Sequence, residues 1–130
     1  MYISMKNINR NFPWCDEYDD SSFTGTLNEK RIWSDEEYFK LDGEIYELSE
    51  KYQTAIQLPR ELVWRIMSIF SYVMTAISCH SNSNDGYEIE NLDTELLFER
   101  RERFQLVIEG FFKDEMPKEK YFEYGNNNEK

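Results

Sequence analysis

The chain has little of the residue types that build disulfide frameworks, metal sites or membrane anchors. Its 130 residues include two cysteines and one histidine, which are Cys15, Cys79 and His80. Two thiols cannot form the disulfide scaffold of a small secreted domain, and the N-terminus lacks the basic start and apolar segment of a secretory signal. We therefore expect free thiols and a cytoplasmic location. The most apolar run, residues 66–79, is interrupted by polar side chains and is shorter than the roughly 20 residues of a membrane span, so no membrane association is expected.

Motifs of the common enzyme classes are also missing. The chain contains no G-x-S-x-G elbow, no phosphate-binding loop and no G-x-G-x-x-G motif. Cys79 and His80 are sequence neighbours near the end of an expected helix, where a nucleophile and its base rarely face each other. We therefore expect no enzymatic activity and no cofactor. One alternative stays open, in which Cys15, Cys79 and His80 form the metal site of a metal-binding regulator or enzyme, although their spacing carries no zinc signature.

Positive charge is scarce. The 15 Lys and Arg residues face 26 Asp and Glu residues, which gives a net charge of −11 and a sequence pI near 4.5. Such a chain repels phosphate backbones, so a nucleic acid is excluded as the expected partner and a basic protein is favoured. With 40% hydrophobic and 16% aromatic residues the chain is too apolar to be disordered. Its length suits one domain over residues 1–130, and we expect a monomer.

Three stretches after residue 33 show the apolar periodicity of helices. Ser34 can cap the first, and Trp33 can pack against Tyr38 as a hydrophobic staple. The second has Pro59 in its first turn and is apolar on nearly every side over residues 62–77, so it is expected at the centre of the fold. The third has candidate caps at its start and is ended by a proline: Asn91, Asp93, Thr94 and Pro117.

These patterns predict a mainly α fold. The predicted architecture is a compact single-domain helical bundle with three principal helices in residues 34–116. Residues 1–33 show no sustained period and are expected to form an irregular arm packed on the bundle, and residues 117–130 a tail. The arginine-rich stretch at residues 100–103 alternates with glutamates, which favours salt bridges over phosphate binding.

The acidic residues gather in two segments. Residues 16–50 hold twelve Asp and Glu against three Lys and Arg, a balance of −9, and residues 85–99 hold six acids and no base. If the two segments lie together, their field would attract a cationic protein and accelerate its association. The predicted binding residues are Asp16, Glu17, Tyr18, Asp19, Asp20, Glu36, Glu37, Asp85, Tyr87, Glu88, Glu90 and Asp93. Trp14, Tyr18, Trp33 and Tyr87 are candidate aromatic anchors.

Three strings carry a resemblance to a known family. They are "RNFPWCDEYDDSSFTGT", "LPRELVWRIMSIFSYVMTAISCHSNSNDGYEIENLD" and "RERFQLVIEGFF". Together they cover most of residues 9–113 and resemble bacterial immunity proteins, the small acidic antidotes encoded beside polymorphic or contact-dependent growth-inhibition toxins. The resemblance implies a non-catalytic protein that binds the C-terminal domain of one cognate toxin and blocks its active site or substrate surface.

The toxin expected from this resemblance is a nuclease, most simply an RNase, whose basic cleft an acidic antidote would cover. The charge pattern agrees with that expectation. A second alternative is an acidic mimic of nucleic acid that inhibits a cellular protein without any linked toxin.

Overall fold

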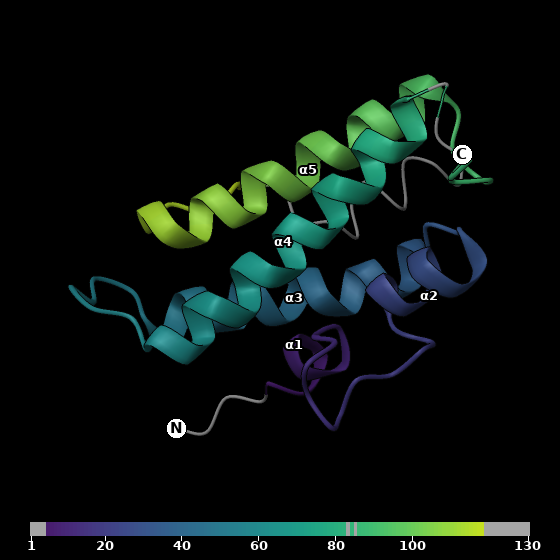
Figure 1. Ribbon diagram of the computed structural model, residues 1–130. Coiled ribbons are helices and arrows are strands. Elements are labelled where there is room, and N and C mark those ends of the chain that lie inside the picture. Colours follow the sequence, from purple (N-terminus) through teal and green to yellow (C-terminus); the bar gives the residue numbers. More distant parts are fainter. Residues whose placement is uncertain (1–4, 83, 85, 119–130) are drawn as a thin grey trace.

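The computed structural model describes residues 5–82, 84 and 86–118, and the fold of this part is built from helices and the loops that connect them (Figure 1). Five helices follow one another, and no strand is present among these residues. The helices are α1 (Lys6–Arg10), α2 (Phe23–Lys30), α3 (Asp35–Lys51), α4 (Arg60–Ser81) and α5 (Thr94–Lys113). The prediction of a mainly α fold is confirmed.

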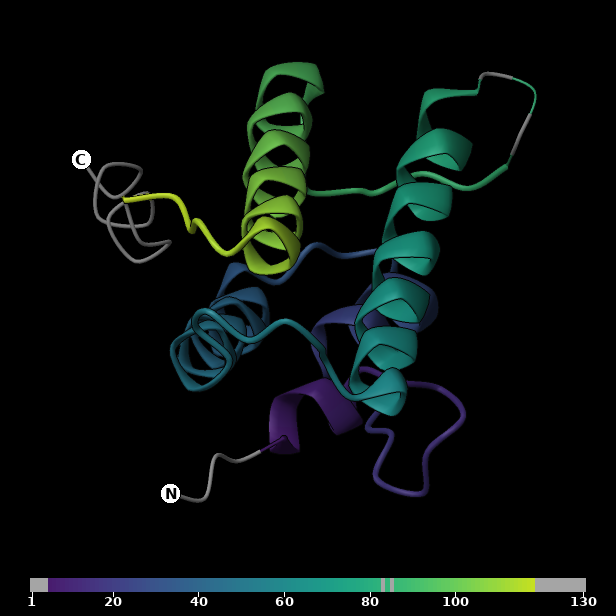
Figure 2. The ribbon, with the colours of Figure 1, turned by 90° about the vertical axis from the view of Figure 1, so that its left-hand side faces the viewer.

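Helix α3 lies at the centre of the bundle. It packs against α1, α2 and α5, and its Tyr38, Leu41 and Ile45 are fully buried. Figure 2 shows α3 nearly end-on, with α5 above it and α1 below, while α4 stands beside α5 and runs in the opposite direction. Helix α4 also contacts α1, α2 and α5, but it leaves one side exposed, so the prediction that it is wrapped by other helices at the centre of the fold is wrong.

Helix α4 buries one side and leaves the other open. Ile66, Ile69 and Val73 face the core, whereas Trp64 and Met67 are exposed. By length and composition its 22 residues could cross a membrane, a test that core helices of soluble proteins also pass. Only 33% of its most apolar stretch is buried. The count of apolar residues suggested burial on every side because it could not show that neighbouring helices cover one face alone.

The predicted irregular arm contains a short first helix that a distant residue stabilises. The N-cap of α1, Met5, makes no side-chain capping bond. Instead the carboxylate of Glu44 in α3 accepts the backbone N–H groups of Asn7 at 3.1 Å and of Ile8 at 2.6 Å. The Glu44 side chain is buried. Because α1 has only five residues, its stability depends on such tertiary contacts.

The second helix of the arm is α2, in the stretch "SFTGTL" that came closest to a strand pattern. The Ser22 hydroxyl accepts the N–H of Gly25 and caps the helix. Asn11, just after α1, accepts the N–H of Thr24 at 2.8 Å, and the Thr24 hydroxyl donates to the Asn11 carbonyl at 2.9 Å. Residues 1–33 are therefore not an irregular arm where the structure describes them, because these two helices are fastened to each other and to α3.

The predicted helix starts agree with the structure. The Ser34 hydroxyl accepts the N–H of Glu37 and caps α3, and Asp93 caps α5 by accepting the N–H of Leu96. The rings of Trp33 and Tyr38 lie 6.0 Å apart, as a hydrophobic staple requires.

Two arginines of α5 hold it against α3. Arg103 donates two hydrogen bonds of 3.1 Å to Asp42, and Arg100 donates bonds of 2.9 and 3.0 Å to Asp35. The first pair is almost fully buried, with 2% and 3% of the side chains exposed, whereas Asp35 is 46% exposed. The prediction of salt bridging by this arginine-rich stretch is confirmed for both residues.

We predict that Asp42→Ala lowers the free energy of unfolding by about 3–5 kcal/mol, because it leaves the Arg103 guanidinium buried without its carboxylate. Urea denaturation followed by circular dichroism measures the change. Glu36→Ala, on the exposed face of the same helix, is the control and should stay within about 0.5 kcal/mol of wild type. Equal losses in both variants would show that the buried pair does not hold α5 to α3.

Candidate protein-binding surface

Both predicted acidic segments are fastened to the short helix α2. The loop between α1 and α2 covers its N-terminal half, and the loop between α4 and α5 reaches its C-terminal half. The structure thus places part of each segment, the α1–α2 loop and residues 86–93, against α2.

The first loop approaches α2 closely at Gly25. A Cβ atom there would lie 2.5 Å from the carbonyl oxygen of Asp20 and 2.6 Å from that of Asp19. Real Cβ atoms do not come this near to backbone, so glycine is the residue that lets Asp19 and Asp20 rest on the helix.

The second loop is pinned along its length. The Tyr87 hydroxyl donates to the carbonyl of Leu27 at 2.8 Å, and the N–H of Glu90 donates to the carbonyl of Arg31 at 2.9 Å. At its start, His80 Nδ1 accepts the N–H of Ile89 at 2.8 Å. Ile89 itself is buried, so residues 86–93 form a packed strap.

Asn91 fixes the far end of this strap. Its side chain accepts the N–H of Trp33 at 2.9 Å and donates to the carbonyl of the same residue at 2.8 Å. The amide therefore imitates a strand partner and joins the strap to the start of α3.

Three half-buried tyrosines line the seam between α2, α4 and the loops. Burial is the first cause that raises the pKa of Tyr72 in α4 to about 12, and the nearby Tyr87, Tyr18 and Glu29 add to the rise. Burial also raises the pKa of Tyr18, with Asp20 and Glu29 contributing. The phenols therefore stay neutral at physiological pH and act as hydrogen-bonding, partly apolar contacts.

The predicted binding residues differ in how accessible they are. The exposed ones are Asp16, Glu17, Asp20, Glu36, Glu88, Glu90 and Asp93. The partly exposed ones are Tyr18, Asp19, Glu37 and Tyr87. Asp85 lies outside the residues that the structure describes.

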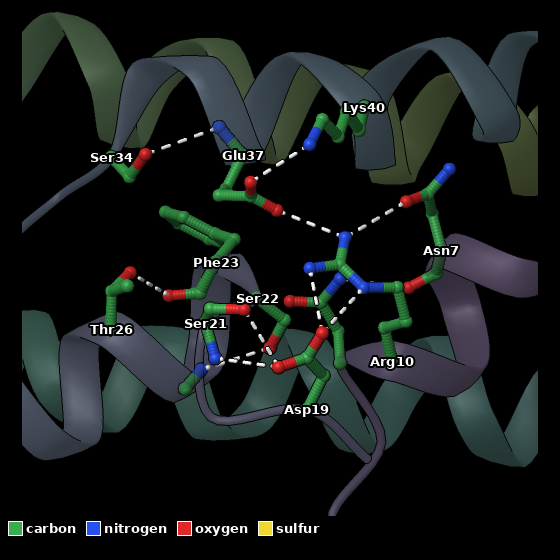
Figure 3. Close-up of polar contacts among 12 residues, drawn as sticks. Asn7, Arg10, Asp19, Ser21, Ser22, Phe23, Thr26, Ser34, Glu37 and Lys40 are labelled. Atoms are coloured by element: carbon green, nitrogen blue, oxygen red, sulfur yellow. Dashed lines mark hydrogen bonds and ion pairs between the residues drawn. The ribbon is translucent and has the colours of Figure 1, made fainter. Parts of the chain in front are cut away.

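Two predicted binding carboxylates are engaged by Arg10 instead (Figure 3). The Arg10 guanidinium lies 3.0 Å from the carboxylate of Asp19 and 2.9 Å from that of Glu37, which also pairs with Lys40 at 2.9 Å. The backbone N–H and hydroxyl of Ser21, followed by Arg10, hold the pKa of Asp19 at about 2. Asp19 and Glu37 thus join the α1–α2 loop to α3, and their charge is already neutralised.

The carboxylates left available around α2 are fewer than the sequence suggested. Asp93 is occupied as the cap of α5, whereas Asp16, Glu17 and Asp20 project from the first loop. Glu29 on α2, which was not among the predicted binding residues, is exposed and lies close enough to Tyr18 and Tyr72 to raise the pKa of both.

Among the predicted aromatic anchors, Trp33 is 2% exposed and belongs to the core, so that assignment is wrong. Its ring packs against Phe23 at 4.7 Å. Trp14 is 77% exposed, and Tyr18 and Tyr87 are half-buried. Trp64 of α4, which is 55% exposed, was not predicted because its place in an apolar run suggested burial.

The fold does not bring Cys15, Cys79 and His80 together. Cys15 contacts Arg65 near the start of α4, and a rise of 1.5 Å per residue puts roughly 20 Å of helix between Arg65 and Cys79. Within residues 5–82, 84 and 86–118, no three His, Cys, Asp or Glu side chains are grouped to hold a metal ion. The metal-site alternative has no geometric support there.

We predict that Gly25→Ala lowers the free energy of unfolding by about 1–3 kcal/mol, because the added methyl group collides with the backbone of Asp19 and Asp20, which must then move. Gly43→Ala is the matched control. Gly43 lies within α3 and has open space around it, so its change should stabilise the protein by about 0.5–1 kcal/mol. Thermal unfolding of the two variants measures the difference, and a stabilised Gly25→Ala protein would contradict the close approach.

The acid dependence of stability should change in Asp19→Asn. The pKa of Asp19 is about 2 in the folded protein and about 3.9 in an unfolded chain. Its carboxylate therefore stabilises the fold above about pH 4, and this contribution is lost as the pH falls towards 2. Urea denaturation at a series of acidic pH values should show that the variant loses less stability as the pH falls. An equal pH dependence in the variant and wild type would show that the Asp19 carboxylate does not stabilise the fold.

Comparison with known proteins identifies the family of the chain. Residues 10–123 match the family described as Immunity protein 41. No match was found among curated proteins or among solved structures. The family match confirms the resemblance seen in the sequence and supports a role in toxin neutralisation. The chain belongs to the Immunity protein 41 family, an immunity protein family of polymorphic toxin systems.

Proposed function

We propose that this immunity protein neutralises a nuclease toxin by covering its basic active-site or substrate-binding surface with the acidic residues around α2. The neutralisation is by binding alone, without a catalytic step. It takes place in the cytoplasm, and the immunity protein acts as a monomer.

The observation that carries the proposal is the convergence of the two acidic loops on α2. Asp16, Glu17 and Asp20 are exposed in the loop that meets the start of α2, and Glu88 and Glu90 are exposed in the loop that is bonded to its end. The loops that carry these carboxylates are fastened by backbone and side-chain hydrogen bonds. A preorganised array of anions loses little entropy on binding and suits the spaced cations of a phosphate-binding cleft.

Lys30 and Arg31 at the end of α2 reduce the negative charge beside the second loop. In the first loop Asp19 is paired with Arg10 and Arg65 contacts Cys15, which leaves Asp16, Glu17 and Asp20 as the exposed carboxylates. We therefore assign the larger share of electrostatic attraction to Asp16, Glu17 and Asp20. Their effect is expected mainly on the association rate, since long-range attraction steers encounter.

Charge reversal tests the proposal. In Asp16→Lys with Glu17→Lys, the association rate with the toxin domain encoded by the adjacent gene should fall about ten-fold or more at low salt, because steering is lost. Surface plasmon resonance at several salt concentrations measures the rate, and the difference from wild type should shrink as salt rises.

The matched control changes the same number of charges elsewhere. Glu47→Lys with Glu50→Lys alters two exposed residues in the part of α3 remote from α2, and its association rate should remain within about three-fold of wild type. Equal reductions in both double variants would mean that only net charge matters. Unchanged binding in both would refute the assigned surface.

A further inference from the structure

Helix α4 exposes a stripe without charge. Its exposed residues recur at steps of three and four: Trp64, Met67, Ser71, Thr75 and Ser78. No Asp, Glu, Lys or Arg occurs after Arg65 in this helix, although 32% of the whole chain is charged. A solvated helix face ordinarily carries charged side chains, so this face is unusual for a surface that stays in water.

The acidic first loop runs beside the N-terminal end of this stripe. The rings of Phe12 and Trp64 meet edge to face with centroids 5.0 Å apart, and Arg65 Nη1 lies 3.8 Å from Cys15 Sγ. Trp14 stands between Phe12 and Cys15 in the chain and is 77% exposed. Trp14 and Trp64 therefore belong to the same part of the surface.

The other edge of the stripe meets α5 in an apolar groove of about 560 Å³. Met67 and Phe70 of α4 line it together with Ile108 and Phe112 of α5, and Glu109 and Lys113 of α5 complete its lining. Met67 thus belongs both to the stripe and to the groove, which extends the apolar surface from the two tryptophans towards α5.

We infer that Trp14, Trp64 and Met67 form the apolar centre of the toxin-binding surface, and that Asp16, Glu17 and Asp20 form its charged rim. The inference rests on the proposed function and adds the residues that hold the complex together. Large aromatic side chains at the centre of an interface supply most of its binding energy, while charges at the rim steer and orient. The occupant is a toxin face with apolar side chains at its centre and Lys and Arg around them.

Charge selects this occupant over two others. An anionic membrane surface would repel the carboxylates of residues 16, 17 and 20. A second copy of the chain would bring the same acidic rim and another net charge of −11. A basic protein is the partner for which both the rim and the centre are favourable.

Single substitutions of the two tryptophans test the inference. Isothermal titration calorimetry with the toxin domain of the adjacent gene, its nuclease site inactivated, should show affinity about ten-fold or more weaker for Trp14→Ser and for Trp64→Ser. The matched control is Phe98→Ser on α5, since Phe98 is 55% exposed like Trp64. Its affinity should stay within about two-fold of wild type.

Trp14→Ser separates a loss of binding from a loss of folding. The Trp14 side chain is largely in solvent, so its replacement should not change the melting temperature. If wild type binds the toxin domain but both tryptophan variants bind as tightly as Phe98→Ser, the inference is overturned while the proposed function stands. If wild type does not bind at all, the proposed function itself fails.

Two further measurements address the other occupants. Wild-type protein is sedimented with vesicles of phosphatidylethanolamine and phosphatidylglycerol, and analytical ultracentrifugation gives its mass in solution. The expected results are no pelleting and a monomer. Pelleting or dimerisation that is lost in Trp64→Ser would assign the stripe to a membrane or to a second copy, and would overturn the inference.

Discussion

The carboxylates of α3 hold the bundle together. Along this one helix, Asp35 and Asp42 accept hydrogen bonds from arginines of α5, and Glu44 accepts backbone N–H groups of α1. Glu37 accepts a hydrogen bond from Arg10, whose other contact is the loop before α2. A buried or half-buried carboxylate without such partners would be strongly destabilising, so each of these residues fixes the position of another element.

This arrangement divides the acidic residues into two groups. Those of α3 that face neighbouring elements serve the fold, whereas Asp16, Glu17 and Asp20 of the α1–α2 loop and Glu88 and Glu90 of the strap are exposed. Sequence reasoning counted both groups together because a carboxylate looks the same whether an arginine lies beside it or not. Asp19 and Glu37 were therefore predicted as binding residues. Their common partner, Arg10, could not be recognised from the sequence, because it lies 27 positions before Glu37.

The parts of the fold that were predictable are those set by local sequence. Ser34 and Asp93 cap the helices that they precede, and the arginines of α5 find carboxylates on another helix. The helices α1 and α2 were not predictable, since they have five and eight residues and depend on Glu44 and Asn11. The prediction that α4 is wrapped on every side was wrong for a related reason: the sequence does not show how many sides of an apolar helix its neighbours cover. The candidate surface was mispredicted in the same way. Trp33 was expected at the surface but is buried, and Trp64 was expected to be buried but is exposed.

The uncharged stripe on α4 has a consequence for the protein before any partner arrives. A helix face that exposes the large apolar side chains of Trp64 and Met67 would promote self-association in a neutral protein. The high negative charge keeps separate copies apart in solution. The carboxylates that we propose to attract a cationic protein thus also oppose self-association, and solubility should be lowest near pH 4.5, where the net charge vanishes.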